Sequence, residues 1–284
     1  ILVFFLSRLT GDPTDLFLPV DASQEARENF RRIHGLNDPL WQQFLRYMGD
    51  LIRLDFGESI RRAEPAINSV LRGFTWTLQL AAITMTLVTV AAIVVGSLAA
   101  FNVGGIFDRI ATFFSLIGAS APDFWIAIVA IVVFSVTLGW VPTSGTGTVW
   151  HWILPIGVLF IRPFGLILQV VRGSMISALS SPYVKTARAK GVRTRPIIFV
   201  HALRNALLPV ITVIGDQAAA LLNGAVVVET IFGFPGVGKL MIDSILQRDF
   251  AVVLAAIMVT AFAIFLMNLI IDILYAVLDP RIRY

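Results

Sequence analysis

Two of the long stretches of the sequence that hold no charged residue restrict the possible folds more than any other feature. One lies between Gly73 and Phe107 and the other between Phe250 and Ile271. About 20 apolar residues at ~1.5 Å per residue cover the ~30 Å hydrocarbon core of a bilayer, so each stretch can cross it as a helix. The chain has 57% hydrophobic residues and a mean hydropathy of +0.84, whereas soluble proteins have ~45–50% apolar residues. The sequence therefore predicts an all-α integral membrane protein.

Five full membrane spans are expected from the apolar stretches, at about 75–101, 111–138, 153–171, 209–228 and 250–271, the last continuing towards Leu278. Residues 1–9, ILVFFLSRL, are apolar but too short to span. We interpret them as the end of a truncated first transmembrane helix rather than a cleaved signal peptide, because no small-residue cleavage site follows. The expected architecture is thus six transmembrane helices.

A basic stretch at residues 172–209 separates two of the spans. Seven of its residues are Lys or Arg and none is Asp or Glu; the basic residues are Arg172, Lys185, Arg188, Lys190, Arg193, Arg195 and Arg204. The net charge of +4 would suggest nucleic acid as a partner of a soluble protein. Because most of the excess lies in one loop between apolar segments, the positive-inside rule explains it better. The chain has no cysteine, which excludes disulfides, thiolate metal sites and thiol catalysis.

The positive-inside rule assigns sides to the connections. It makes the 102–109 turn, the basic loop and the C-terminus cytoplasmic, and puts residues 10–72, 139–148 and 229–249 on the other side. We expect three parts: the end of the first helix at 1–9, an external, periplasmic-side helical segment at 10–72, and a transmembrane core at 73–284 with a cytoplasmic loop at about 172–209.

The external segment at 10–72 contains the signals of two helices. Gly35 is placed to end the first, and Asp38-Pro39 to start the second, which carries apolar residues at three-to-four spacing over 40–52 and is amphipathic. We favour a small cap packed on the membrane domain. The alternative is a docking surface for substrate delivery.

The basic stretch has closely spaced helix signals. Ser181-Pro182 is a helix start, Gly191 is a stop, and Thr194-Arg195-Pro196 starts a second helix that runs into the next span. A helix of about two turns is too short to be stable alone, so we expect it to dock on something. The alternative is a solvated positive-inside loop that touches anionic lipid.

Polar residues inside the later spans are candidates for lining a pathway, because charges and amides in a bilayer must face protein or water. They are Asp216, Gln217, Asn223, Asn268 and Asp272. Counted from Pro209 and Asp279, the two acids lie ~10 Å in from the cytoplasmic end. Hydrogen bonding between helices explains these residues equally well.

Other motifs do not support an enzyme. GFPGVGK at 233–239 matches the core of a phosphate-binding loop after the strand-like run VVVET, but Leu240 stands where a Ser or Thr should bind magnesium and the topology places the segment outside. His34, His151 and His201 are too scattered for a metal site, and no Ser/His/Asp arrangement stands out. An intramembrane enzyme is therefore the weakest interpretation.

Several segments together resemble one family. YVKTARAKGV followed by HALRNALLPV is similar to the cytoplasmic EAA-type loop of ABC importer permeases of the oligopeptide/dipeptide (and nickel) group. LDFGESI at 54–60, PDFWIAIVAIVVFSVTLGWVPTSG at 122–145, GAVVVETIFGFPGVGKL at 224–240 and LDPRIR at 278–283 resemble the same group, in the same order. The chain departs from the general motif where Lys185-Thr186-Ala187 replaces Glu-Ala-Ala, and its spacing from Gly191 to Pro209 is longer.

The resemblance implies a non-enzymatic permease subunit with the type I ABC importer fold, in the bacterial inner membrane. Its coupling helix would dock into a groove on a cytoplasmic ATPase and act as a lever; the residues implied are Pro182, Tyr183, Val184, Lys185, Thr186, Ala187, Arg188, Ala189, Lys190 and Gly191. The implied partners are a second homologous permease, two ATP-binding cassette ATPases and an extracytoplasmic substrate-binding protein, with no nucleic acid. ATP and magnesium would be bound by the ATPases, with no cofactor on this chain.

Peptides are the substrates that the resemblance favours; nickel chelates, glutathione or other small amides remain open. The rival from another class is an ion-coupled secondary transporter or channel that uses Asp216 and Asp272 as coupling groups.

Overall fold

The computed structural model describes residues 14, 18, 22–33, 35–59 and 61–278. The expected end of a first span at 1–9 and the C-terminal LDPRIR motif beyond Leu278 lie outside the described residues. The chain forms two compact units: the first combines the part up to Trp76 with Gly236–Ala261, and the second combines Thr77–Pro235 with the part from Phe262.

Within the described residues, four helical segments are long and apolar enough to cross a membrane, or five if a bent pair counts as one span. They are α5 (Ala66–Phe101), α8 (Trp150–Leu179), α14 (Phe250–Leu278) and a continuous segment formed by α10 (Thr194–Pro196), the π-helix η2 (Ile197–Ala202) and α11 (Leu203–Gly224). Long apolar helices are confirmed where these four spans are expected, while the expected total of six stays a prediction. Pro209 lies inside α11 rather than at its start, so the depth of Asp216 cannot be counted from that proline.

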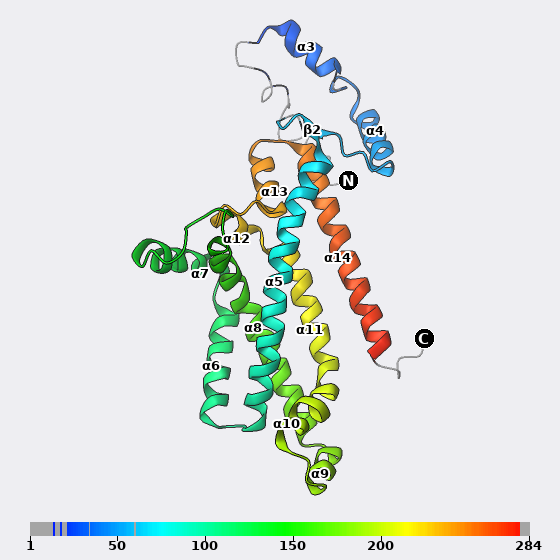
Figure 1. The fold of residues 1–284 in the computed structure, drawn as a ribbon. Helices are drawn as coiled ribbons and strands as arrows, with labels where there is room; N and C mark the ends of the chain where they lie inside the picture. The colour runs from blue at the N-terminus through cyan, green and yellow to red at the C-terminus, as the bar shows by residue number, and fades with distance from the viewer. Residues whose placement is uncertain (1–13, 15–17, 19–21, 34, 60, 279–284) are drawn as a thin grey trace. The chain divides into compact units, whose positions relative to one another are not determined.

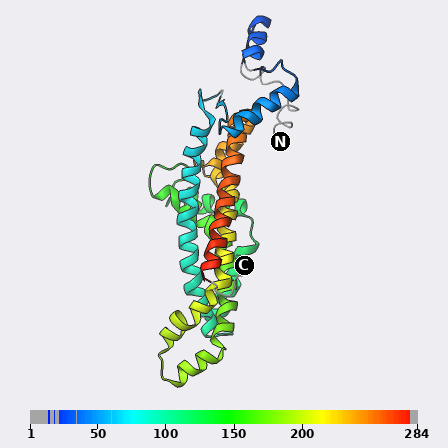
Figure 2. The same ribbon diagram turned by 90° about the vertical axis from the view of Figure 1, so that its right-hand side faces the viewer.

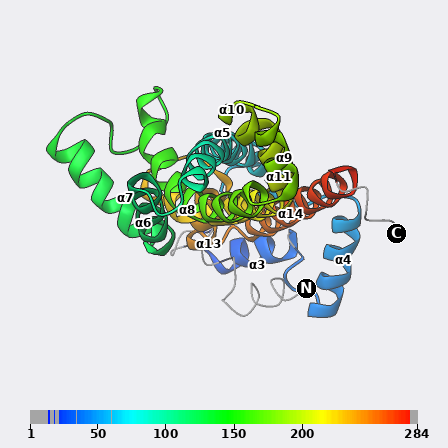
Figure 3. The ribbon, with the colours of Figure 1, turned by 90° about the horizontal axis from the view of Figure 1, so that it is seen from below.

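The third expected span is not one straight helix. It is divided into α6 (Ile106–Ser120) and α7 (Asp123–Ala130), which continues as the π-helix η1 (Ile131–Thr137), and the two parts meet at 104°. The break falls at Ala121, whose ψ of 135° is extended. A residue before proline avoids the helical region because the proline ring clashes with it, and Pro122 follows here. Figure 3 shows α7 directed away from α6 and α8.

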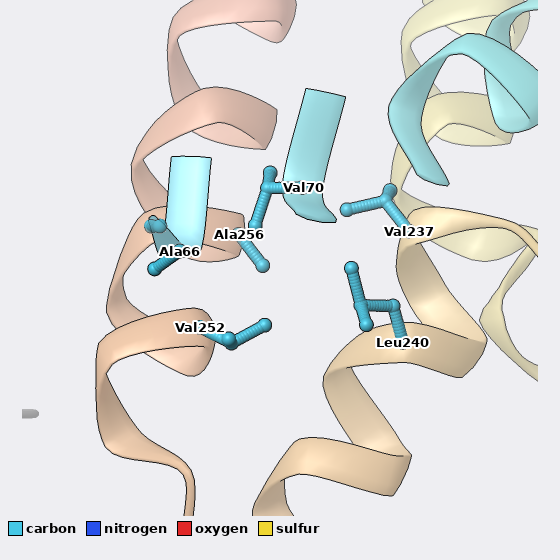
Figure 4. Close-up of a cluster of buried hydrophobic side chains, with 7 residues drawn as sticks. Ala66, Val70, Val237, Leu240, Val252 and Ala256 are labelled. Carbon is cyan, nitrogen blue, oxygen red and sulfur yellow. The ribbon is translucent and has the colours of Figure 1, made fainter. Parts of the chain in front are cut away.

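The first unit contains α3 (Gln24–Ile33), α4 (Leu40–Ile52), the short antiparallel strands β1 (Glu58–Ser59) and β2 (Glu64–Pro65), α13 (Val237–Leu246) and the first turns of α5 and α14. Its core is small and aliphatic: Ala66, Val70, Val237, Leu240, Val252, Ala255 and Ala256 are buried together (Figure 4). Small side chains let three helix ends approach closely.

The apolar face of α4 is covered only in part among the described residues, since Phe44, Met48 and Leu51 are half-buried. Trp41, Leu45 and Ile52 are 61%, 60% and 80% exposed, while the one buried side chain is polar, that of Gln43. Gln43 donates hydrogen bonds to the backbone carbonyls of Leu36 and Asp38 and so holds the start of the helix. The amphipathic pattern is confirmed, and the packing of this segment on the membrane domain as a cap stays a prediction.

In the second unit, α6 and α8 pack antiparallel along a seam of small residues (Figure 1). A Cβ at Gly165 would lie 2.4 Å from the carbonyl oxygen of Ser115, and one at Gly118 would lie 2.9 Å from Cγ2 of Ile161. The buried residues of α6 are Asp108, Ala111, Ser115 and Gly118, at helical spacing on one face. Small residues at such a seam let the two backbones approach closely.

The connections of the second unit gather at its two ends. α9 (Pro182–Ala189), α10 and the turn after α5 lie at one end in both Figure 1 and Figure 2. At the other end, the loop before α8 contacts the segment after α12 (Val226–Ile231): Gly145 N–H donates to the Phe232 carbonyl at 3.0 Å. Trp152 and Phe234 pack edge to face with ring centroids 4.9 Å apart. Within the second unit, successive connections between the helices therefore lie at alternate ends, as the alternation of spans predicts.

Candidate functional site

The short helix predicted in the basic stretch is present as α9. Ser181 has extended backbone angles and its carbonyl accepts the N–H of Val184 at 3.1 Å, so the helix starts at Pro182 as expected. The Ser181 hydroxyl does not cap α9; it donates instead to the carbonyl of Ala178 at the end of α8. Ser181 therefore joins the end of α8 to the start of α9.

Gly191 ends α9 with a left-handed turn. Its φ is +77°. The Gly191 N–H donates to the carbonyl of Arg188 at 2.9 Å, and the Val192 N–H donates to that of Ala187 at 3.1 Å. This pair of hydrogen bonds is the Schellman motif, which satisfies the last carbonyls of a helix and favours glycine at the left-handed position. The predicted stop is confirmed.

α9 is docked within the chain through one apolar side chain. Val184 is fully buried, and α9 packs on η2, which in turn contacts α8. This contact supplies the stability that a helix of about two turns lacks by itself. The neighbouring Tyr183 is 39% exposed. The predicted helix therefore docks on another part of the same chain, η2.

Six of the seven basic residues of the stretch are exposed; they are Lys185, Arg188, Lys190, Arg193, Arg195 and Arg204. None of the six forms an ion pair within the described chain. They make an uncompensated positive surface around α9, which suits an acidic protein partner or anionic lipid headgroups.

The seventh, Arg172, has a different role that sequence reasoning missed. Its Nε and Nη2 donate to the two carboxylate oxygens of Asp108, the second at 2.8 Å, and Asp108 is only 3% exposed. The Gly104 N–H donates to the same carboxylate at 2.8 Å. The one signal in the sequence was a lone acid next to a Gly-Gly turn, which does not identify its partner 64 residues away.

A second buried carboxylate was also missed. Glu229 in α12 is fully buried, and the Thr77 hydroxyl donates to its Oε1 at 2.5 Å. The run VVVET forms the helix α12 rather than a strand, and a Schellman turn with Gly233 at φ +60° follows it. Since a phosphate-binding loop follows a strand, the fold removes the structural context of the P-loop match at 233–239.

The pathway candidates lie mostly on the outside of the described chain. Asp216, Asn268 and Asp272 are exposed and Gln217 is half-buried, while the side chain of Asn223 lies outside the described residues. A Cβ at Gly215 would lie 2.3 Å from Cδ1 of Ile271, so α11 and α14 approach closely there. Asp216 and Asp272 each follow one of these contact residues and are therefore brought to the same level of the second unit.

One apolar cavity of about 700 Å³ lies between α7, η1 and the start of α8. Phe134, Trp140, Trp150 and Leu154 are among its eleven lining residues, none of which carries a charge. Tryptophans are frequent at membrane interfaces, where one end of the ring is apolar and the other wet. The cavity lacks the convergent polar groups that fix the orientation of a polar substrate.

The two histidines that the structure describes lie in different elements. His151 accepts the Thr148 N–H at Nδ1, at 3.1 Å, and so closes the turn before α8. His201 is exposed in η2, and His34 lies outside the described residues. The described residues hold no group of three or more His, Cys, Asp or Glu that could bind a metal ion.

Comparisons with known proteins connect this geometry to a family. Residues 92–284 match the family described as "Binding-protein-dependent transport system inner membrane component". The "Oligopeptide transport system permease protein AppB" of Bacillus subtilis (strain 168) is 40% identical, with 96% of this chain and 90% of that protein covered. The "Di/tripeptide transport system permease protein DppB" of Pseudomonas aeruginosa (strain UCBPP-PA14) is also 40% identical, with 100% and 94% covered.

A solved structure shows the same fold. A chain of the "Inward facing conformations of the MetNI methionine ABC transporter: CY5 native crystal form" matches with a TM-score of 0.59 at 17% identity. The match covers 74% of this chain and 96% of that chain. At this identity the likeness concerns the fold alone, which is that of ABC importer permeases.

Proposed function

Because the chain belongs to the family of binding-protein-dependent transport system inner membrane components, we propose that it is a permease subunit of an ATP-driven importer of di- and oligopeptides. The observation that carries the proposal is α9: a short helix with defined ends, docked by Val184 and surrounded by exposed cations that form no ion pair with the described residues. The full-length similarity to an oligopeptide and a di/tripeptide permease supports peptides as the substrate.

In the proposed complex, α9 is the contact with a cytoplasmic ATPase. Closure of two ATP-binding cassette subunits moves α9, and α8 and η2 pass the movement to the spans, because α9 packs on η2 and η2 contacts α8. ATP and magnesium are bound by those partners, and this chain performs no catalysis and binds no cofactor. This places the basic loop at 172–209 and the C-terminus on the cytoplasmic side of the inner membrane, as the positive-inside rule favours.

The pathway forms where this chain meets a second, homologous permease. Asp216, Asn268 and Asp272 are exposed on the isolated chain, and a charge in a span avoids lipid, so the partner permease or water covers them. On the opposite side, an extracytoplasmic binding protein delivers the peptide. The exposed apolar side chains of α4, those of Trp41, Leu45 and Ile52, suit such a docking surface.

The decisive experiment uses the complete complex in proteoliposomes, with peptide, binding protein and ATP. Uptake is expected to stop when the catalytic site of the ATPase subunits is inactivated, and to be indifferent to an imposed proton gradient. Uptake that survives the ATPase knockout and follows the gradient would establish the ion-coupled transporter instead. Competition by a nickel chelate or glutathione at equal concentration separates the alternative substrates.

Neutralising the two exposed acids distinguishes the same alternatives on this chain. Asp216→Asn and Asp272→Asn are expected to lower ATP-driven uptake by less than about tenfold, because one lost polar contact changes binding by roughly 1 kcal/mol. Uptake is measured in proteoliposomes with and without an ionophore. Complete loss of uptake in either variant, with assembly and ATP hydrolysis unchanged, would contradict a passive lining role.

A further inference from the structure

The ion pair between the buried Asp108 and the half-buried Arg172 lies at the end of the α6–α8 seam from which the chain continues into α9. Along the antiparallel seam, Asp108 faces Arg172, Ser115 faces Gly165 and Gly118 faces Ile161. These two helices carry four Lys, Arg, Asp or Glu residues, and the other two, Arg109 and Arg162, are exposed. The pair is therefore the single ionic contact in a seam that is otherwise made of small and apolar groups.

We propose that the Asp108–Arg172 pair is a positioning clamp for coupling, which holds α6 and the turn before it in register with the end of α8 so that displacement of α9 moves both helices together. The inference rests on the proposed function, and goes beyond it by assigning a role to two residues outside α9. Neither residue contacts substrate or nucleotide in this role.

The geometry of the pair suits a rigid connection. The guanidinium binds both carboxylate oxygens through Nε and Nη2, and a two-point contact fixes orientation as well as distance. The third donor, Gly104 N–H, belongs to the turn between α5 and α6. Because Asp108 is 3% exposed, its charge depends on these donors and has little access to water as a substitute. The carboxylate thus joins α8, α6 and the preceding turn at one point.

The position of the pair gives it a mechanical consequence. Arg172 lies about two turns before the end of α8 at Leu179. The chain then enters α9 through Ser180 and Ser181, and the Ser180 N–H donates to the Ile176 carbonyl at 3.2 Å while the Ser181 hydroxyl donates to Ala178. The connection is short and hydrogen bonded, so a displacement of α9 reaches α8 directly.

The rest of the seam cannot replace this connection. Glycines and a serine allow close approach of α6 and α8, but contacts of this kind resist sliding only through shape. Without the ion pair, α8 can slide against α6 when α9 is displaced. Part of the movement of α9 then fails to reach α6. ATP hydrolysis then continues while fewer substrate molecules are moved per ATP.

The test measures the ratio of peptide uptake to ATP hydrolysis in the reconstituted complex. Asp108→Asn and Arg172→Lys are expected to lower this ratio at least fivefold, Arg172→Lys because an ammonium cannot make the two-point contact. The exchange variant, Asp108→Arg with Arg172→Asp, is expected to raise the ratio above that of either single variant; recovery is incomplete because the Gly104 N–H loses its acceptor. Assembly is read by size-exclusion chromatography; if Asp108→Asn does not assemble, the ratio is read on Arg172→Lys, which keeps the positive charge.

The ratio of uptake to hydrolysis distinguishes three cases: a clamp for coupling, a purely structural role of the ion pair, and failure of the proposed function. A structural role predicts that uptake and hydrolysis fall together with the amount of assembled complex, leaving the ratio unchanged, and this result overturns the proposal. A lowered ratio that the exchange variant does not raise assigns the loss to packing and also overturns it. If the wild-type complex shows no ATP-driven uptake at all, it is the proposed function that fails.

Discussion

Replacing Gly191 with leucine is expected to leave the membrane domain assembled while lowering peptide uptake per ATP by about tenfold, since a left-handed conformation costs a non-glycine residue ~1–2 kcal/mol. Gly191 has φ +77°, and no heavy atom lies within 4 Å of a Cβ built there. The penalty is therefore backbone strain rather than a clash. The chain relieves it by giving up the hydrogen bonds from Gly191 and Val192 that end α9, and α9 loses its fixed direction.

Two control variants show whether strain or lever function is responsible. Gly191→Asn is expected to keep most of the coupling, because asparagine tolerates the left-handed region better than other residues. Gly139→Leu imposes comparable strain in the connection at the opposite end of the second unit, where φ is +64° and the space is also open. It is expected to couple normally. A wild-type ratio of uptake to hydrolysis in Gly191→Leu would refute the lever assignment.

Replacing Gly165 with leucine is expected to prevent α6 and α8 from packing and to abolish recovery of folded protein. Even alanine places its Cβ 2.4 Å from the backbone carbonyl oxygen of Ser115 and 3.2 Å from the N of Ala119. Backbone atoms cannot rotate away as a side chain does, so the helices must separate. Overpacking costs roughly 1–3 kcal/mol for small additions and more for a whole side chain.

Gly173, on the same helix, supplies the matched control. It is exposed and has no heavy atom within 4 Å of a built Cβ. Gly173→Ala is expected to be neutral or stabilising by up to about 1 kcal/mol, since alanine favours a helix over glycine. Thermal unfolding of the detergent-solubilised complex measures both series. Equal melting temperatures for Gly165→Ala and Gly173→Ala would contradict the close seam.

Most of the helices could be predicted because the bilayer imposes a strict rule on backbone polar groups. A chain that enters hydrocarbon must satisfy its own N–H and C=O groups, so an apolar run of sufficient length forms a helix whatever its neighbours are. The runs in α5 and α14 are of this kind. α9 was also predictable, because Ser181-Pro182 and Gly191 act through local backbone preferences.

The errors have different local causes. Pro122 was visible in the sequence, but proline inside a membrane helix is often tolerated, as Pro155 and Pro163 are within α8. Whether a proline bends a helix slightly or breaks it depends on what the following segment packs against. The run VVVET has strand-forming residues, yet forms α12 because contacts with α7 and α8 override a weak intrinsic preference.

Some features of the candidate site could likewise be predicted from the sequence, and others could not. Residues 182–191 could be identified as a helix with defined ends, but its docking through Val184 on η2 could not, because which face of a short helix is buried depends on a partner element. The polar residues Asp216 and Asp272 could be found individually. That they reach one level follows only from the close approach of Gly215 and Ile271.

The sequence by itself determined that this chain crosses a membrane several times, where its excess positive charge lies, and where α9 starts and stops. These properties follow from hydrophobicity, charge and backbone preference, which act within a few neighbouring residues. Only the tertiary structure decided that the third apolar run breaks at Ala121, that Gly165 lies against Ser115, and that Arg172 is paired with Asp108. Contacts between residues far apart in the chain depend on how helices approach one another in space, and no local pattern encodes that approach.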